Sequence, residues 1–184
     1  MSDGGVTAGR GSAGGPHGAD VPGPGVRIVR VTGRDWRTLR EVRLHALAEA
    51  PSAFGSTLER ELAYEEHTWR ERAGAGRTFL ARLDGDVVGL VSYYVEPGRE
   101  DERQLVSMWV DPRARGSGAA VQLVAAVREA AAVEGARVLT LFVADGNDRA
   151  RRLYERLGFR PTGERQPLPS NPARGEERYA VRLG

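Results

Sequence analysis

Residues 105–120, LVSMWVDPRARGSGAA, join an apolar strand pattern to a loop of small residues and then to the start of a helix. The strand ends at Asp111-Pro112, because the residue before proline stays extended and proline cannot donate to a strand ladder. Gly116 and Gly118 lie where the helix begins. The first amides of a helix lack intrahelical partners and carry partial positive charge, and glycine lets a phosphate approach the backbone closely. The stretch therefore predicts an anion site suited to a pyrophosphate, whereas a plain turn would need only one glycine and no flanking arginine.

Several ligands carry a pyrophosphate, among them dinucleotides, nucleoside triphosphates and coenzyme A, and the spacing of the loop discriminates among them. A dinucleotide-binding fingerprint that starts at Gly116-Ser117-Gly118 would need a third glycine where Val121 stands. A P-loop needs a lysine, and the chain contains none. Both nucleotide-binding loops therefore fit poorly.

The rest of the chain alternates strand and helix patterns around this stretch. Alternating apolar residues and short apolar runs predict strands at 26–31, 78–83, 87–95, 103–110, 138–143 and 176–183. Helical spacing predicts helices at 34–50, 58–72, 116–134 and 147–157. The second helix should break near Ala63 and Tyr64, and Asp84-Gly85-Asp86 should form a hairpin turn. The helix at 116–134 is expected to bury Val121, Leu123, Val124, Val127 and Ala131. This order predicts an α/β fold with a mixed sheet and helices on both faces.

Residues 1–25 differ from the rest in composition. They contain nine of the 24 glycines and three of the 10 prolines, with no aromatic residue and no apolar periodicity. Such a segment buries too little surface to offset its chain entropy. We therefore expect a disordered Gly/Pro-rich tail at 1–25 and one folded domain at 26–184.

Composition excludes several classes of chemistry. The 184 residues include no cysteine, which rules out disulfides, a cysteine nucleophile and thiolate metal sites, and the three histidines are too scattered to predict a metal centre. The 27 arginines are interspersed with 25 acidic residues for a net charge of +2, so no nucleic-acid partner is expected. Every apolar run is shorter than a membrane span and no secretion signal is visible, so we expect no membrane partner and a cytoplasmic protein.

A second informative stretch, residues 143–159, reads VADGNDRARRLYERLGF and follows an apolar strand. Asn147 is a good N-cap for the helix in this stretch, and Gly158 is a good C-cap. Tyr154 shares one face with the apolar residues of the helix, so it should point inward. An isolated tyrosine in such a place is usually a core residue whose hydroxyl bonds a carbonyl.

Residues 115–120 resemble the Arg/Gln-x-x-Gly-x-Gly/Ala loop of the GNAT superfamily of acetyl-CoA-dependent N-acetyltransferases, and they follow an Asp-Pro pair as that loop often does. The same pattern can be read from Arg113, although the spacing from Pro112 favours Arg115 as its first residue. Residues 143–159 resemble the downstream element of the family, in which a strand leads to Asn, Ala three positions on, a Leu-Tyr pair and a closing Gly-Phe. The resemblance extends over residues 26–184, and outside the two motifs it rests on the order of the elements.

The resemblance implies a fold, a reaction and a site. The GNAT fold has a mixed, mostly antiparallel central sheet of six to seven strands with helices on both faces. Acetyl-CoA would be the co-substrate, with no metal. Tyr154 would be the catalytic residue, beside the CoA sulfur, where it donates a hydrogen bond or a proton to the leaving thiolate. The strand at 107–110 would donate a backbone amide to the carbonyl oxygen as it becomes negative. Asn147 would contact the pantetheine arm. The residues expected to contact acetyl-CoA are Met108, Trp109, Val110, Arg115, Gly116, Ser117, Gly118, Ala119, Ala120, Asn147 and Tyr154.

The amine would attack the thioester directly in a ternary complex, because the chain has no cysteine to carry an acetyl group. The amine must first be neutral, and deprotonating an alkylamine with a pKa near 10 costs about 4 kcal/mol at neutral pH. Four candidate bases, each also typical of a solvated helix surface, are Glu59, Glu61, Glu65 and His67. Three aromatic residues that either shape an acceptor pocket or pack the helices are Phe54, Tyr64 and Trp69. Three arginines that either reach the CoA phosphates or form a charged helix face are Arg149, Arg151 and Arg152.

The acceptor is expected to be a primary amine of a small molecule. Acetylation of a protein N-terminus or lysine is an alternative, which an open groove rather than a closed pocket would favour. Two further alternatives are a non-catalytic CoA-binding regulatory module and a Rossmann-type nucleotide-binding domain. A homodimer is left open, and the sequence names neither the acceptor nor the general base.

Overall fold

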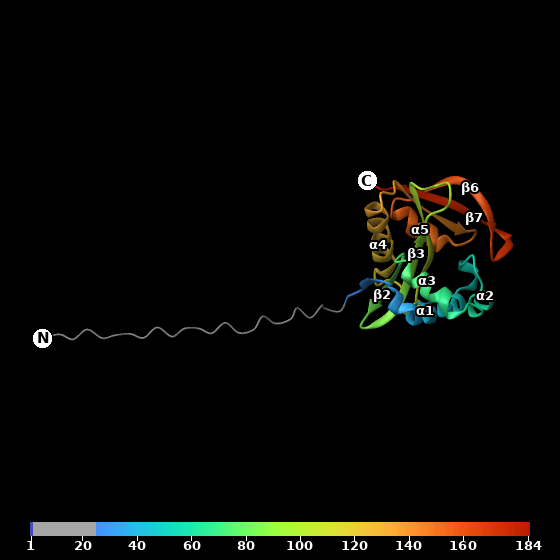
Figure 1. The fold of residues 1–184 in the computed structure, drawn as a ribbon. Coiled ribbons are helices and arrows are strands. Elements are labelled where there is room, and N and C mark those ends of the chain that lie inside the picture. The colour runs from blue at the N-terminus through green and yellow to red at the C-terminus, as the bar shows by residue number, and fades with distance from the viewer. Residues whose placement is uncertain (2–24) are drawn as a thin grey trace.

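The computed structural model describes residue 1 and residues 25–184. The tail predicted at 1–25 lies outside the described residues, apart from Met1 and Gly25. The remaining residues form one sheet with helices on both faces (Figure 1), which confirms the α/β class. Within the described part of the chain, no helix combines the length and the apolar character needed to cross a membrane.

The central sheet has seven strands in the order β1-β2-β3-β4-β5-β7-β6. Their bounds are β1 Arg27–Arg30, β2 Thr78–Leu83, β3 Asp86–Tyr94, β4 Glu102–Val110, β5 Val138–Ala144, β6 Arg160–Leu168 and β7 Asn171–Arg182. In this sheet β4 and β5 pair in parallel, and all other neighbours are antiparallel. The predicted hairpin joins β2 to β3, with φ of 52° at Asp84 and 93° at Gly85, as a two-residue turn between twisted strands requires. The structure confirms a mixed, mostly antiparallel sheet.

The helices form two layers, one on each face of the sheet. The first layer holds α1 (Trp36–Glu49), α2 (Leu58–Leu62) and α3 (Glu66–Gly74), and the predicted break between the last two is confirmed at residues 63–65. The second layer holds α4 (Ala119–Val133) and α5 (Asp148–Arg156). Each layer has its own apolar core, one built around Leu47 and Trp69 and the other around Leu123 and Phe159. The two faces of the sheet therefore have different surroundings, called below the α1 side and the α4 side.

The C-terminal hairpin departs from the prediction. Strand β6 was missed, and β7 begins at Asn171 rather than at residue 176. Pro161, Gly163 and Pro167 conceal the strand pattern in β6. Prolines are tolerated there because β6 is an edge strand, where a missing amide donor does not interrupt a ladder on both sides.

The predicted start of α4 was also wrong. The prediction began the helix at Gly116, but the structure begins it at Ala119, because Gly116 and Gly118 have φ of 90° and 87° and cannot belong to a right-handed helix. Val121, expected in the core, is 47% exposed and lies in the first turn, where it borders a cleft. The other four residues expected to be buried in this helix are buried.

Candidate functional site

A cleft opens where β4 and β5 separate. The two strands pair over only three residues before they diverge. Beyond that point, residues 105–110 of β4 and residues 141–144 of β5 line the two walls of a cleft of about 600 Å³. Ala50 lines it from the α1 side and Tyr154 from the α4 side. The cleft therefore lies between the strands and is lined by residues on both faces of the sheet.

Ser107 marks the point at which β4 changes direction. Its φ is 59°, and the pairing of β4 with β3 shifts register at this point. A bulge of this kind inserts one residue and exchanges the faces of the side chains that follow. Leu105 and Met108 consequently both pack on the α4 side, whereas Trp109 is buried on the α1 side, edge-on to the ring of His45. Residues 107–110 line the cleft where β5 no longer pairs with β4.

The loop before α4 presents backbone amides at one end of the cleft. Gly118 is the N-cap of α4, and Ser117 Oγ accepts a hydrogen bond of 3.4 Å from the amide of Ala119. The next two amides, of Ala120 and Val121, are first-turn donors without intrahelical partners. Both residues line the cleft, together with Gly118 and Ala119. Left-handed glycines and unpaired first-turn amides are the features that a pyrophosphate requires.

The two candidate arginines of this loop have different partners. Arg113 donates to Asp111 from both its side chain and its amide, and these hydrogen bonds lower the pKa of the Asp111 carboxyl to about 2. Arg115 instead borders the cleft, where it donates to the carbonyl of Val110 and pairs with Glu49 at 3.2 Å. Of the two alignments of the loop motif, the geometry favours the one that begins at Arg115.

Asn147, the N-cap of α5, and Tyr154 of the same helix both line the cleft from the α4 side. Asn147 caps α5, because its Oδ1 accepts a hydrogen bond of 3.1 Å from the amide of Ala150. This bond leaves the two Nδ2 hydrogens of Asn147 free to donate to a ligand. Asn147 therefore serves the helix with one end of its amide and faces the cleft with a donor.

Tyr154 is only 5% exposed and packs edge-on against Phe159, with ring centroids 5.6 Å apart. Among residues 25–184, none forms a hydrogen bond with its hydroxyl. Burial raises the pKa of Tyr154 far above its ordinary value of 10.0, so the phenol stays protonated at neutral pH. It is available as a hydrogen-bond donor, in contrast to the core tyrosine bonded to a carbonyl that the sequence left open.

The four bases considered from the sequence do not line the cleft. Glu61 is 1% exposed and forms a buried ion pair with Arg43 at 2.7 Å. Glu65 and His67 pair with each other on the surface, and Glu59 is exposed. The three aromatic residues offered for an acceptor pocket, Phe54, Tyr64 and Trp69, pack in the α1-side core.

Glu176 is the carboxylate that the sequence analysis missed. It lies on β7 opposite Ala144, is 8% exposed and lines the cleft. Gln166 donates to its Oε1 at 2.7 Å. The signal in the sequence was a glutamate on the same face as Arg178 and Ala180, inside a strand pattern, but strand pairing alone brings it to the cleft.

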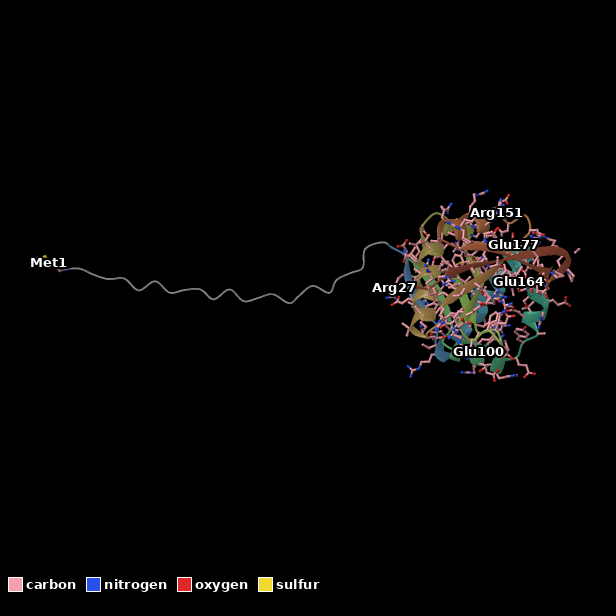
Figure 2. All side chains as sticks on the ribbon, turned by 90° about the horizontal axis from the view of Figure 1, so that it is seen from above. Met1, Arg27, Glu100, Arg151, Glu164 and Glu177 are labelled. Atoms are coloured by element: carbon pink, nitrogen blue, oxygen red, sulfur yellow. The ribbon has the colours of Figure 1, made fainter. Side chains whose placement is uncertain are left out.

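Two arginines of α5 line the cleft. Arg149 and Arg156 line it, and the second of these was not anticipated. Arg151 pairs instead with Asp148 at 2.8 Å on the outer face of α5, where Figure 2 labels it. Arg152 is exposed and does not line the cleft. Of the three arginines proposed from the sequence, one borders the cleft.

Known proteins resemble this chain in sequence and in fold. Mycothiol acetyltransferase of Thermomonospora curvata is 34% identical over 127 residues, which are 69% of this chain and 41% of that protein. The L-methionine sulfoximine/L-methionine sulfone acetyltransferase of Pseudomonas aeruginosa is 33% identical over 108 residues, 56% of this chain and 63% of that protein. The chain thus spans about 40 to 60% of the length of these relatives.

The fold matches that of the putative acetyltransferase yncA from Salmonella typhimurium, solved with its cofactor acetyl-CoA, with a TM-score of 0.69 and 18% identity over 86% of this chain and 94% of that one. The model of the acetyltransferase (GNAT) family matches residues 42–159, a range that includes the split between β4 and β5, the glycine loop and α5. The chain therefore belongs to the GNAT acetyltransferase family.

Proposed function

We propose that this chain is an N-acetyltransferase that moves the acetyl group of acetyl-CoA directly to a primary amine of a small molecule, within a ternary complex. The observation that carries the proposal is the cleft between β4 and β5, which is lined by residues on both faces of the sheet. Two substrates can enter such a cleft from opposite faces and meet between the strands. A non-catalytic CoA-binding module would have no need of a cleft that extends to the second face of the sheet.

The residues of the α4 side fit coenzyme A. First-turn amides at Ala120 and Val121 would hold the pyrophosphate, with Arg149 and Arg156 close enough to the cleft to add charge. Asn147 would donate to the pantetheine arm. The main chain at Met108, Trp109 and Val110, where β5 no longer pairs, would supply amide donors to the thioester carbonyl. Acetyl-CoA supplies the activated acetyl group.

Tyr154 would donate a hydrogen bond to the sulfur that leaves. Its raised pKa keeps the proton on the phenol, so a hydrogen bond to the developing thiolate is its principal role. Direct transfer follows from the absence of cysteine in the chain. The amine must therefore reach the thioester itself, from the α1 side.

The acceptor side favours a small molecule over a peptide. The tip of the β6–β7 hairpin reaches across to the start of α2 (Figure 1), where Ser170 donates to the carbonyl of Phe54 and Pro169 packs against Gly55. This contact lies directly after Ala53, which lines the cleft. The relatives named for mycothiol and for methionine sulfoximine agree with a small acceptor. A cytoplasmic location and a homodimer remain predictions.

The test follows the release of free CoA from acetyl-CoA by the purified full chain, with aminoglycosides, polyamines, amino acids, amino-sugar thiols and short peptides as acceptors. Release stimulated by a small amine, with the acetylated product identified by mass spectrometry, would support the proposal. Peptide-only stimulation would replace the small acceptor with a protein one. Binding of CoA without turnover on any acceptor, measured by calorimetry, would favour the regulatory module, and no binding would refute the proposal.

A further inference from the structure

The two sides of the cleft carry different chemistry, because side chains alternate between the faces of β5. Leu141 and Val143 point to the α4 side and pack with Tyr154. The intervening residues Phe142 and Ala144 therefore point to the α1 side. Glu176 pairs with Ala144 in the register of β5 and β7, so it shares that face. Glu176 and Tyr154 thus line one cleft from opposite sides of the sheet.

The carboxylate of Glu176 is buried, and no arginine or histidine of residues 25–184 pairs with it. Gln166 of β6 donates to Oε1 at 2.7 Å, which leaves Oε2 without a protein donor among the described residues. Arg178, two positions along the same face, is already paired with Glu164 at 3.0 Å and with Glu102. Burial, and then the negative charges of Glu96 and Glu176, raise the pKa of Tyr94 on β3, so this phenol is near the same carboxylate.

Arg174, two positions before Glu176 on β7, donates to the carbonyl of Asp145, and two further charged groups of this region are paired with other side chains. Arg165 binds Asp145 at 2.7 Å, and Glu49, at the end of α1 beside the cleft, is held by Arg115. Burial raises the pKa of Glu176 above its ordinary value, and the hydrogen bond from Gln166 only partly offsets this. A desolvated carboxylate with a free oxygen is a stronger base than an exposed one and attracts a cation.

We propose that Glu176 is the catalytic base for the acceptor and that it selects substrates whose amine arrives as an ammonium ion. The inference rests on the proposed function. Oε2 of Glu176 binds the ammonium group from the α1 side and accepts one of its protons. Because this oxygen lies across the sheet from Tyr154, the base and the donor to the leaving group act at opposite ends of the reacting atoms.

Atoms and charges balance in this step. The ammonium loses one proton to Glu176, and its nitrogen then uses the freed electron pair to bond the acetyl carbon. The carbon–sulfur bond breaks, and the sulfur leaves with the two electrons of that bond. The nitrogen loses a second proton as the amide forms, and one proton ends on the sulfur while Glu176 releases the other to solvent. An ammonium ion and acetyl-CoA thus yield an acetamide, CoA thiol and one proton, with no oxidant or reductant.

The test compares Glu176→Gln with a matched control, Glu177→Gln. The side-chain amide of the Glu176→Gln variant is isosteric with the carboxylate, and its oxygen can still accept from Gln166, so folding should be preserved, as thermal unfolding will verify. Glu177, labelled in Figure 2, is the next residue of β7, and it pairs with Val143, so its side chain points to the α4 side. For the best amine of the panel, kcat/KM is measured from pH 6 to pH 10 in the wild type and both variants.

We expect Glu176→Gln to lower kcat/KM at pH 7 by about 100-fold, and Glu177→Gln to change it by less than about threefold. The deficit of Glu176→Gln should shrink about tenfold per pH unit as neutral amine replaces ammonium, whereas the wild-type value stays flat between the pKa of Glu176 and the pKa of the amine. Glu176→Asp should recover part of the activity.

Each other outcome has a defined meaning. A Glu176→Gln variant that keeps its activity and the wild-type pH profile would overturn the inference and leave the proposed acetyltransferase intact. A uniform loss at every pH would also overturn it, because a merely structural residue would act in this way. Failure of the wild type to acetylate any amine of the panel would overturn the proposed function and this inference with it.

Discussion

The indole Nε1 of Trp109 donates a hydrogen bond of 2.9 Å to Oε2 of Glu49, the last residue of α1. The same carboxylate pairs with Arg115 in the loop that follows β4. One side chain therefore joins the bulged part of β4, the end of α1 and the loop that precedes α4. This junction borders the cleft on the α1 side, because Ala50 directly follows Glu49.

Two substitutions of Glu49 should show how much each of its two contacts contributes to the free energy of unfolding. Glu49→Ala leaves the buried indole N–H without an acceptor and should cost about 1–3 kcal/mol in the free energy of unfolding. Glu49→Gln retains an acceptor for Trp109 and loses only the partly exposed ion pair with Arg115, which is worth about 0–1 kcal/mol. Urea unfolding measures both. Equal losses in the two variants would show that the ion pair, not the indole bond, holds the junction.

Removing the hydroxyl of Tyr154 should affect turnover and not binding. We expect Tyr154→Phe to lower kcat by about 10- to 100-fold, the weight of one hydrogen bond to a charged group, and to change the Kd for acetyl-CoA by less than about threefold. Because burial raises the pKa of Tyr154 above its ordinary value, the phenol stays protonated and the deficit should be constant from pH 6 to pH 9.

Tyr179→Phe is the matched control, since Tyr179 is buried in the same core but does not line the cleft. It should leave kcat and the Kd for acetyl-CoA unchanged. A Tyr154→Phe variant that turned over normally but bound acetyl-CoA weakly would assign Tyr154 to binding.

The left-handed glycine at the N-cap of α4 should be needed for the cofactor loop. Gly118 has a φ of 87°, and an alanine there costs about 1–2 kcal/mol of strain or forces the loop to rearrange. We expect Gly118→Ala to weaken acetyl-CoA binding by about 10-fold in calorimetry. Gly135→Ala, at the other end of α4 with a φ of 78°, carries the same strain away from the cleft. It should lose stability alone, and weakened binding in both variants would contradict the prediction.

The buried ion pair of Glu61 should be structural. Glu61→Gln leaves the buried guanidinium of Arg43 without its counter-charge and should cost about 3–5 kcal/mol. Glu65→Gln, at an 81% exposed side chain on the same segment, should cost less than about 0.5 kcal/mol. If Glu61→Gln kept its stability but lost activity, a catalytic role for Glu61 would have to be reconsidered.

The ionisation of Glu61 should also make the stability of the protein depend on pH. Burial alone would raise the pKa of Glu61, but hydrogen bonds and charge from Arg43 and Arg72 lower it below its ordinary value of 4.5. The stabilisation is therefore fully present above about pH 4.5 and disappears as the pH falls through the lower, folded-state pKa. Urea unfolding of the wild type and Glu61→Gln should differ by a constant amount from pH 5 to pH 8 and converge below that range.

Local patterns in the sequence account for most of the elements. The Asp-Gly turn, the proline after β4 and the two caps of α5 act over a few residues, and each predicted feature is present in the structure. The missed strand β6 has a local reason too, since prolines and a glycine are compatible with an edge strand but not with a recognisable strand pattern. The exposed Val121 follows from the left-handed glycines, which delay the start of α4 by three residues.

The sequence by itself determined the family, the glycine loop before α4 and the places of Asn147 and Tyr154, because caps, glycines and helix faces are set by neighbours within one or two turns. Only the tertiary structure decided which carboxylate enters the cleft. Glu61, a candidate base in the helix predicted at 58–72, pairs with Arg43 and Arg72 instead, whereas Glu176 lies far along the chain and is brought to the cleft by the pairing of β7 with β5. Strand pairing between distant segments, and the bulge that turns the side chains of β4, depend on packing across the whole sheet, which no local pattern encodes.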